Sequence, residues 1–460
     1  MRFDLYLPKA PKIMNIKLPN FLKTFIYLFF VGVFSSCSDN RRERTSTKEE
    51  VKTTPQASQT TKNVIIEPKL YLEHSGSMYF YDGPTVKGQF KNTLVTLMQG
   101  FEKIKPEIPP IYIVNDQVYP YPNDFKTLIT SKSVFATKIG NPAFTDFQSI
   151  FSTILTDLKQ DQVAILLSDL IYSGKNSAGK SAQKIMDEAQ QLCQMTFTNY
   201  AANTSVLVIK LHSDYQGVYY PYNSPNKGKK YQGNRPYYVC LFAKNQTMEK
   251  LLKENLYSQI RSFEQLPDFQ NKVFFSNGSL LSAPYYTILQ DDSDGKGQFN
   301  KGDNSLNTKG LHAIKNVEAP HRSTDKLTLC VAVSFPKGAL EESEIMNVNN
   351  YQIDGFKDGF KLKSVKIVNR TDGTTHKLLL EASKIAGGVR EVKIKFKRTF
   401  PQQWIQNTHS EDDTSVNPNS DFATQTFGFI NMMRGLNQAF ELPNASDKNN
   451  YFTLTLKLED

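Results

Sequence analysis

Between residues 64 and 263, short apolar runs alternate with amphipathic stretches, and this alternation limits the folds open to the chain. The run at 163–167 is apolar throughout, as is typical of a parallel strand buried on both faces. The stretches 89–105 and 147–158 carry apolar residues at helical spacing. Such alternation predicts a doubly wound α/β domain with a mostly parallel sheet, and ligands are expected at the carboxyl ends of its strands.

The pattern changes after about residue 267. The runs 327–335, 359–368, 376–382 and 389–396 alternate apolar and polar residues between turn-forming dipeptides, which predicts half-buried strands. We therefore expect a C-terminal β-sandwich of the immunoglobulin-like type. The predicted organisation is a signal peptide at 1–36, a flexible tether at 37–63, the α/β domain at 64–265 and the β-rich domain at 266–460.

Oxygen-bearing side chains lie at the ends of the predicted strands. Glu73, Ser75 and Ser77 follow the apolar run at 69–72. Thr145 lies just before a predicted helix, and Asp169 ends the run at 163–168. The ends of parallel strands meet at one edge of a sheet, so these five side chains are expected to lie together. Hard oxygen ligands suit Mg²⁺, Mn²⁺ or Ca²⁺, and the sequence predicts a divalent-cation site.

This order of residues resembles the metal-ion-dependent adhesion site of von Willebrand factor A-type (vWA) domains, which reads Asp-x-Ser-x-Ser, then Thr, then Asp. The resemblance covers residues 64–263 and implies a Rossmann-like α/β fold. It also implies that the serines and the threonine hold the metal, with the carboxylates outside or acting through water, and that an acidic group of a partner completes the shell. Glu73 replaces the family's first Asp and is longer by about 1.5 Å, a change that Ca²⁺ or Mn²⁺ tolerates better than Mg²⁺. The alternative is a decayed site whose hydroxyls cap the following helices.

A tyrosine-rich segment at 212–235 lies between two predicted strands. Its glycine, proline, asparagine and lysine content favours a long loop. Clustered tyrosines offer rigid contact area and hydroxyl groups, which predicts a partner-binding surface. The alternative is a tyrosine-rich cap packed over a strand end. The tyrosines predicted to bind a partner are Tyr215, Tyr219, Tyr220 and Tyr222.

The N-terminus has the features of a bacterial export signal. Lys17 and Lys23 precede an apolar run at 25–34, which is too short to span a bilayer. The small residues before Cys37 resemble a lipobox, with Phe34 in place of the usual Leu. We therefore expect Cys37 to carry lipid and to anchor the protein in the bacterial cell envelope, at the outer membrane or at a periplasmic or surface face.

Charge argues against nucleic-acid binding. The formal net charge is +10, of which residues 1–36 carry +4 and residues 38–63 carry +2. The remainder is spread without a basic stripe. The other cysteines, Cys193, Cys240 and Cys330, are expected to be buried thiols or to include one disulfide. The acidic run 291–297 lacks both end carboxylates of an EF-hand, which predicts a solvated linker.

Neither a phosphate-binding loop nor a nucleophile elbow is present in the sequence, and the histidines form no metal-type pair. Binding is therefore favoured over catalysis. We expect an envelope lipoprotein that binds a protein or glycan partner through the metal site. The resemblance implies that this partner carries an acidic group. Two alternatives stay open: a metal-dependent hydrolase that uses the same oxygens, and a structural scaffold of an envelope complex whose metal site is unused.

Overall fold

A computed structural model describes residues 66–102, 109–172, 177, 179–224, 227–253, 265–277, 284–303, 309–318, 326–335, 340, 342–354, 359–382, 390–397, 400, 402–441 and 450–459. The chain divides into one unit at Met1–Lys62 and another at Asn63–Asp460. All described residues belong to the second unit, and the predicted signal peptide, Cys37 and the whole of the predicted tether lie outside them. None of the helices in the described ranges is long and apolar enough to cross a membrane.

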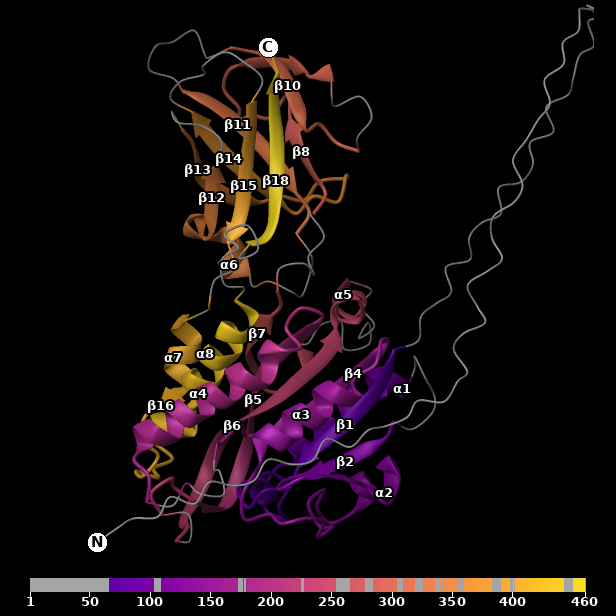
Figure 1. The fold of residues 1–460 in the computed structure, drawn as a ribbon, viewed down its shortest axis with the longest axis vertical. Coiled ribbons are helices and arrows are strands. Elements are labelled where there is room, and N and C mark those ends of the chain that lie inside the picture. The colour runs from indigo at the N-terminus through magenta and orange to yellow at the C-terminus, as the bar shows by residue number, and fades with distance from the viewer. Residues whose placement is uncertain are drawn as a thin grey trace, which may run out of the picture. The chain divides into compact units, whose positions relative to one another are not determined.

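A seven-stranded sheet forms the centre of the first half, in the order β3-β2-β1-β4-β6-β5-β7 (Figure 1). Its strands are β1 (Glu67–Glu73), β2 (Ile111–Val114), β3 (Val118–Pro120), β4 (Gln162–Ser168), β5 (Thr204–Tyr219), β6 (Lys229–Lys244) and β7 (Phe269–Phe275). β1 pairs in parallel with β2 and β4, whereas the other four pairings are antiparallel. The structure confirms that helices and strands combine in a mixed α/β fold. The prediction of a mostly parallel sheet is wrong, because among the described pairings of this sheet only those of β1 with β2 and with β4 are parallel.

The long hairpin of β5 and β6 explains much of this difference. The two strands pair from Thr204 opposite Lys244 to Tyr219 opposite Lys229, which covers most of the segment predicted as a loop. Tyr215 and Tyr219 share one face of β5, where both are buried. Alternation of tyrosines with polar residues is a strand pattern, and burial of the tyrosine face outweighs the turn-forming residues between them.

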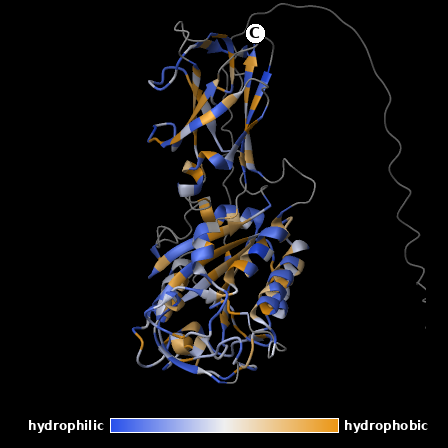
Figure 2. Cartoon of the chain, turned by 90° about the vertical axis from the view of Figure 1, so that its left-hand side faces the viewer, coloured by the Kyte–Doolittle hydropathy of each residue, from blue (hydrophilic) through white to orange (hydrophobic). Residues whose placement is uncertain are grey.

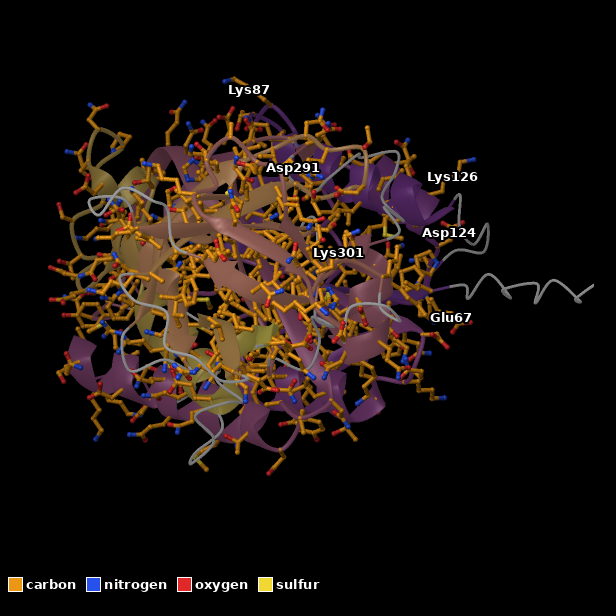
Figure 3. All side chains as sticks on the ribbon, turned by 90° about the horizontal axis from the view of Figure 1, so that it is seen from above. Glu67, Lys87, Asp124, Lys126, Asp291 and Lys301 are labelled. Carbon is orange, nitrogen blue, oxygen red and sulfur yellow. The ribbon has the colours of Figure 1, made fainter. Side chains whose placement is uncertain are left out.

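Helices cover both faces of the sheet. They are α1 (Gln89–Glu102), α2 (Phe125–Thr130), α3 (Phe147–Asp157), α4 (Ala182–Thr198) and α5 (Asn245–Lys253). β4 is buried along its whole length, because Ile165 and Leu167 join the core on one face while Ala164 and Leu166 join the core on the other. Figure 2 shows hydrophobic strands beneath helices that carry hydrophilic residues. The carboxylate of Asp124 accepts the amide of Thr127 and caps α2, whose first residues lie at the rim in Figure 3.

A C-terminal segment packs against the same sheet. It comprises α7 (Gln402–Thr408), β16 (His409–Ser410), β17 (Thr426–Phe427) and α8 (Phe429–Phe440), with a short 3₁₀ turn at Asp421–Ala423. α8 lies beside α4 (Figure 1), and Phe440 contacts the rings of Phe197 and Phe275. β7 and this segment therefore belong with the seven-stranded sheet, although the sequence-based boundary at residue 265 grouped them with the β-rich domain.

The remaining strands form two further sheets, in the orders β12-β15-β18-β10-β9 and β13-β14-β11-β8. Their bounds are β8 (Tyr286–Leu289), β9 (Gln298–Lys301), β10 (Ala313–Glu318), β11 (Leu327–Val333), β12 (Tyr351–Asp354), β13 (Phe360–Ile367), β14 (His376–Ala382), β15 (Arg390–Lys397) and β18 (Asn450–Glu459), with α6 at Glu342–Met346. Phe335, just after β11, contacts His376 of β14 in one sheet and both Phe396 of β15 and Phe452 of β18 in the other. Apolar side chains from both sheets therefore meet.

The acidic run at 291–297 is held against β11, β13 and β14. Asp292 and Asp294 lie 2.7 and 2.8 Å from the ammonium of Lys377, and Asp294 also pairs with Lys366 at 2.8 Å. The backbone of Lys296 exchanges two hydrogen bonds with Thr328. The segment is solvated as expected, since most of residues 291–297 are exposed, but ion pairs and a β-bridge hold it, so it is not a free linker.

Candidate functional site

Glu73 joins three segments of the chain. It is the last residue of β1 and is only 1% exposed. One carboxylate oxygen accepts the hydroxyl of Thr145 at 2.5 Å, and the other accepts the hydroxyl of Ser168 at the end of β4. The parallel strands β2-β1-β4 end at a common edge, which places Thr145 and Asp169 beside β1 as the sequence predicted.

Ser75 and Ser77 lie on the turn that follows β1. Their hydroxyl oxygens are 3.1 Å apart. The amide of Gly76 donates to the carbonyl of Pro142 at 3.0 Å, which ties this turn to the segment that carries Thr145. Ser75 is buried and Ser77 is half-buried, so the pair faces outward from the sheet edge with Ser77 the more accessible of the two.

Asp169 lies just after β4 and is 1% exposed. One carboxylate oxygen accepts the amide of Ile171 at 3.1 Å. The second oxygen is buried and has no hydrogen-bond partner within the described ranges. Leu170 has a φ of 51°, in the left-handed region that costs a branched residue conformational energy. The chain thus holds a strained turn and an unsatisfied carboxylate oxygen at the same place.

Two buried carboxylates lie at this edge of the sheet, those of Glu73 and Asp169. Burial is the main cause of the raised pKa of Glu73, and the charge on Asp169 adds to it. The hydroxyls of Ser168 and Thr145 act in the opposite direction by hydrogen bonding to the carboxylate. Burial also raises the pKa of Asp169, against the opposing effects of the Ser77 hydroxyl and of the positive charge on buried Arg235. A proton or a cation between these groups is therefore favoured.

The donor set fits a hard divalent cation. Two adjacent ligands of an octahedral Mg²⁺, each at about 2.1 Å from the ion, lie about 3.0 Å apart. The 3.1 Å between the Ser75 and Ser77 hydroxyls matches this separation. The free oxygen of Asp169 supplies charge, whereas both oxygens of Glu73 already accept hydroxyls. Among the described residues no group of three or more His, Cys, Asp or Glu gathers, so hydroxyls must supply the remaining ligands.

A cavity of about 710 Å³ opens beside the serine turn. Ser75 and Ser77 line it together with aromatic side chains, among them Tyr220, Tyr222 and Phe427. Asp413 also lines it, although its two oxygens are bonded to the hydroxyl of Tyr219 at 2.6 Å and the amide of Tyr222 at 3.1 Å. The predicted metal site therefore lies at a cavity large enough for a small ligand.

The structure divides the four tyrosines predicted to bind a partner. Tyr215 and Tyr219 are each 1% exposed, and their hydroxyls bond the carbonyl of Val218 and the carboxylate of Asp413. Their assignment to an exposed partner-binding surface is therefore corrected: both are packed, as the alternative expected, but within a strand of the hairpin and not in a cap over a strand end. Tyr220, which is 39% exposed, and Tyr222 line the cavity, and buried Tyr219 also contributes to its wall.

Several residues at this site had no signal in the sequence. Asp413 and Phe427 come from the C-terminal segment, almost 200 residues after the tyrosines that they contact. Arg235 is 1% exposed, and its guanidinium lies 4.0 Å from the ring centre of Phe422 and 4.9 Å from that of Tyr219. These contacts bind the C-terminal segment to the hairpin and so complete the cavity wall.

The histidine and cysteines near the sheet have structural roles. His74 is fully buried, its ring packs edge-on against Phe135, and burial lowers its pKa to about 4. The structure has buried free thiols at Cys193, Cys240 and Cys330. This agrees with the expectation of buried thiols and not with that of a disulfide. Burial raises the pKa of Cys193 to about 12, which makes a nucleophilic role unfavourable.

Comparisons of this chain with protein-family models, with curated proteins and with solved structures returned no match.

Proposed function

We propose that this chain is a lipid-anchored protein of the bacterial cell envelope that binds a partner through a metal-dependent site. The single observation that supports it most is the unsatisfied, buried oxygen of Asp169 beside a second buried carboxylate and a correctly spaced hydroxyl pair. A buried, unpaired carboxylate oxygen is costly unless a cation or a donor satisfies it. The adjoining cavity gives a partner access to Ser77.

Each of the five site residues has a distinct part in this proposal. Ser75, Ser77 and Thr145 would hold the cation through their hydroxyl oxygens, and Asp169 would contribute charge. Glu73 would orient Thr145 and Ser168 through the hydrogen bonds that it accepts from them. A bound Mg²⁺, Mn²⁺ or Ca²⁺ supplies positive charge, to which an oxygen-bearing group of a partner binds.

The proposal extends to the fold type and to the anchor. The parallel centre β2-β1-β4, with the candidate site at its carboxyl edge, supports a vWA-like arrangement for the first part of the chain. The contacts of Phe335 with His376 of one β-rich sheet and with Phe396 and Phe452 of the other support an immunoglobulin-like sandwich for the second. The lipobox-like residues before Cys37 support attachment to a membrane through lipid.

Calorimetric titration of the purified protein with Mg²⁺, Mn²⁺ and Ca²⁺ tests the proposal. We expect saturable binding of at least one ion, and we expect the double variant Ser75→Ala/Ser77→Ala to abolish it. The variant Ser152→Ala on α3, outside the site, is the matched control and should bind as the unmodified protein does. Absence of binding, or equal binding by the double variant, would contradict the proposal.

A further inference from the structure

The cavity beside the serine turn has a largely aromatic lining without a cationic side chain. Eight aromatic side chains contribute to it, and Lys, Arg and His are absent from its described lining. The rings of Tyr222 and Phe427 stack 4.9 Å apart with an angle of 5° between them, which makes one wall flat. Such a lining offers broad apolar faces but no cationic side chain for an anionic ligand.

Tyr220 places a second aromatic face over the serine turn. A Cβ atom built on Gly76 would lie 3.6 Å from the ring of Tyr220, so the ring and the turn are in contact. Tyr220 is also 39% exposed, and with Met195 and Ile367 it is among the most exposed large hydrophobic side chains in the described ranges. A ligand in the cavity can therefore touch this ring and the hydroxyl of Ser77 together.

The polar groups with remaining hydrogen-bonding capacity in the described lining are neutral: hydroxyls and the side-chain amide of Asn141. The hydroxyl of Ser177 is buried and has no hydrogen-bond partner among the described residues. Ser75 and Ser77 bond each other and keep further donor and acceptor capacity. The only carboxylate of the lining, Asp413, already accepts two hydrogen bonds. The lining therefore complements a ligand with apolar faces and several neutral hydroxyl groups.

We propose that the cavity binds the neutral end of a glycan. A sugar ring presents an apolar face of C–H groups, which stacks on Tyr220 or on the Tyr222–Phe427 wall, and its rim of hydroxyls bonds to Ser77 and Ser177. This inference rests on the proposed function, because it names the partner that reaches the serine turn. A sugar hydroxyl is then the oxygen that completes the cation's shell.

A protein segment fits the lining less well. An extended peptide is usually recognised through backbone hydrogen bonds to an open strand edge. The described lining of this cavity comes mostly from turns, with only Tyr219 at the end of β5 and Phe427 of the two-residue β17 from strands, so it presents no extended strand edge to a peptide. A volume of about 710 Å³ is also in the range of pockets that enclose small ligands.

Saturation-transfer NMR with the full-length protein in detergent tests the glycan proposal. The probes are neutral oligosaccharides of two to four units built from glucose, mannose, galactose or N-acetylglucosamine, each with Mg²⁺ and again with EDTA. We expect at least one to bind at millimolar concentration or below, and Tyr220→Ala to weaken its affinity at least tenfold. Tyr285→Ala, a half-buried tyrosine outside this cavity, is the matched control and should bind normally, and thermal melting verifies that both variants fold.

The outcomes separate this inference from the metal site. Sugar binding that is weakened by Tyr220→Ala but survives EDTA supports the glycan proposal and contradicts the role of the metal. Cation binding without binding of any probe overturns the glycan proposal and leaves the metal site standing. Sugar binding that Tyr220→Ala does not weaken also overturns it, since the sugar is then bound elsewhere.

Discussion

The hydroxyl of Thr145 donates a 2.5 Å hydrogen bond to the carboxylate of Glu73, 72 positions earlier in the chain. The second oxygen of the same carboxylate accepts the hydroxyl of Ser168. A shorter aspartate on the same backbone would withdraw its carboxylate from these donors. The extra methylene that distinguishes this site from the vWA pattern therefore has a structural use, which is to connect the ends of β1 and β4 and the loop before α3.

The raised pKa of Glu73 predicts a pH dependence of stability in the absence of metal. Its pKa rises from 4.5 to about 8 on folding, so the folded state favours the protonated acid. The stability linked to this group is present below pH 4.5 and is lost as the pH rises toward 8. In urea denaturation with EDTA, the free energy of unfolding should fall less between pH 5 and pH 8 in Glu73→Gln than in the unmodified protein.

The exposed residue Glu411 provides the control for this measurement. Glu411→Gln should lose as much stability between the two pH values as the unmodified protein does. If Glu73→Gln loses the same amount as well, Glu73 is ionised in the folded state across this range and the assignment is wrong.

Docking of α8 on α4 depends on Gly435. A Cβ atom at this position would lie 2.2 Å from the carbonyl oxygen of Gln190. Gly435→Ala should therefore push the helices apart and lower the free energy of unfolding by about 1–3 kcal/mol. Gly83→Ala is the control, because a Cβ atom at Gly83 meets nothing within 4 Å. Equal stability of the two variants in thermal melting would show that α8 does not pack as closely as described.

The bond between Tyr219 and Asp413 fixes the C-terminal segment to the hairpin. Tyr219→Phe removes the hydroxyl that donates to Asp413 at 2.6 Å and leaves a buried carboxylate with one donor fewer. The free energy of unfolding should fall by about 1–3 kcal/mol. Tyr220→Phe, at an exposed tyrosine, should change it little. A fall of the same size in both variants would contradict the assigned role of this hydrogen bond.

The proposed lipidation of Cys37 predicts that replacing this residue moves the protein out of the membrane. Cys37→Ser should prevent acylation, because serine lacks the thiol that would carry the lipid. The protein should then leave the membrane fraction. Metabolic labelling with a tagged fatty acid and fractionation of cells measure both effects. Cys240→Ser is a control within the folded part and should keep the label. Label retained on Cys37→Ser would show that the lipobox resemblance is misleading.

The centre of the sheet and its edge were predictable because their signals are local. The apolar run of β4 has no polar face, which identifies a fully buried strand, and Asp169 follows it directly. Glu73, Ser75 and Ser77 lie within five residues at the end of β1. Parallel pairing of β1 with β2 and β4 then brings Thr145 and Asp169 to the same edge.

The packing of α8 and the β5–β6 hairpin were not predictable, because they depend on contacts between residues far apart in the sequence. Nothing in the sequence of α8 specifies that Gly435 fits against Gln190 of α4, because helix packing depends on the partner's surface. The hairpin was missed because Gly217 and Gly233 read as turn signals, whereas each lies within a strand. At Gly217 the reason is space: a Cβ atom there would overlap the ring of Phe80.

The most direct test of the central claim is a crystal structure of the protein soaked in Mn²⁺, with anomalous scattering used to locate the ion. The account predicts an anomalous peak within coordination distance of the Ser75 and Ser77 hydroxyls, and near the free oxygen of Asp169. Crystals of Ser75→Ala/Ser77→Ala should lack this peak. A peak elsewhere only, or an unmodified site without a peak at saturating Mn²⁺, would contradict the claim that these residues form a metal-dependent binding site.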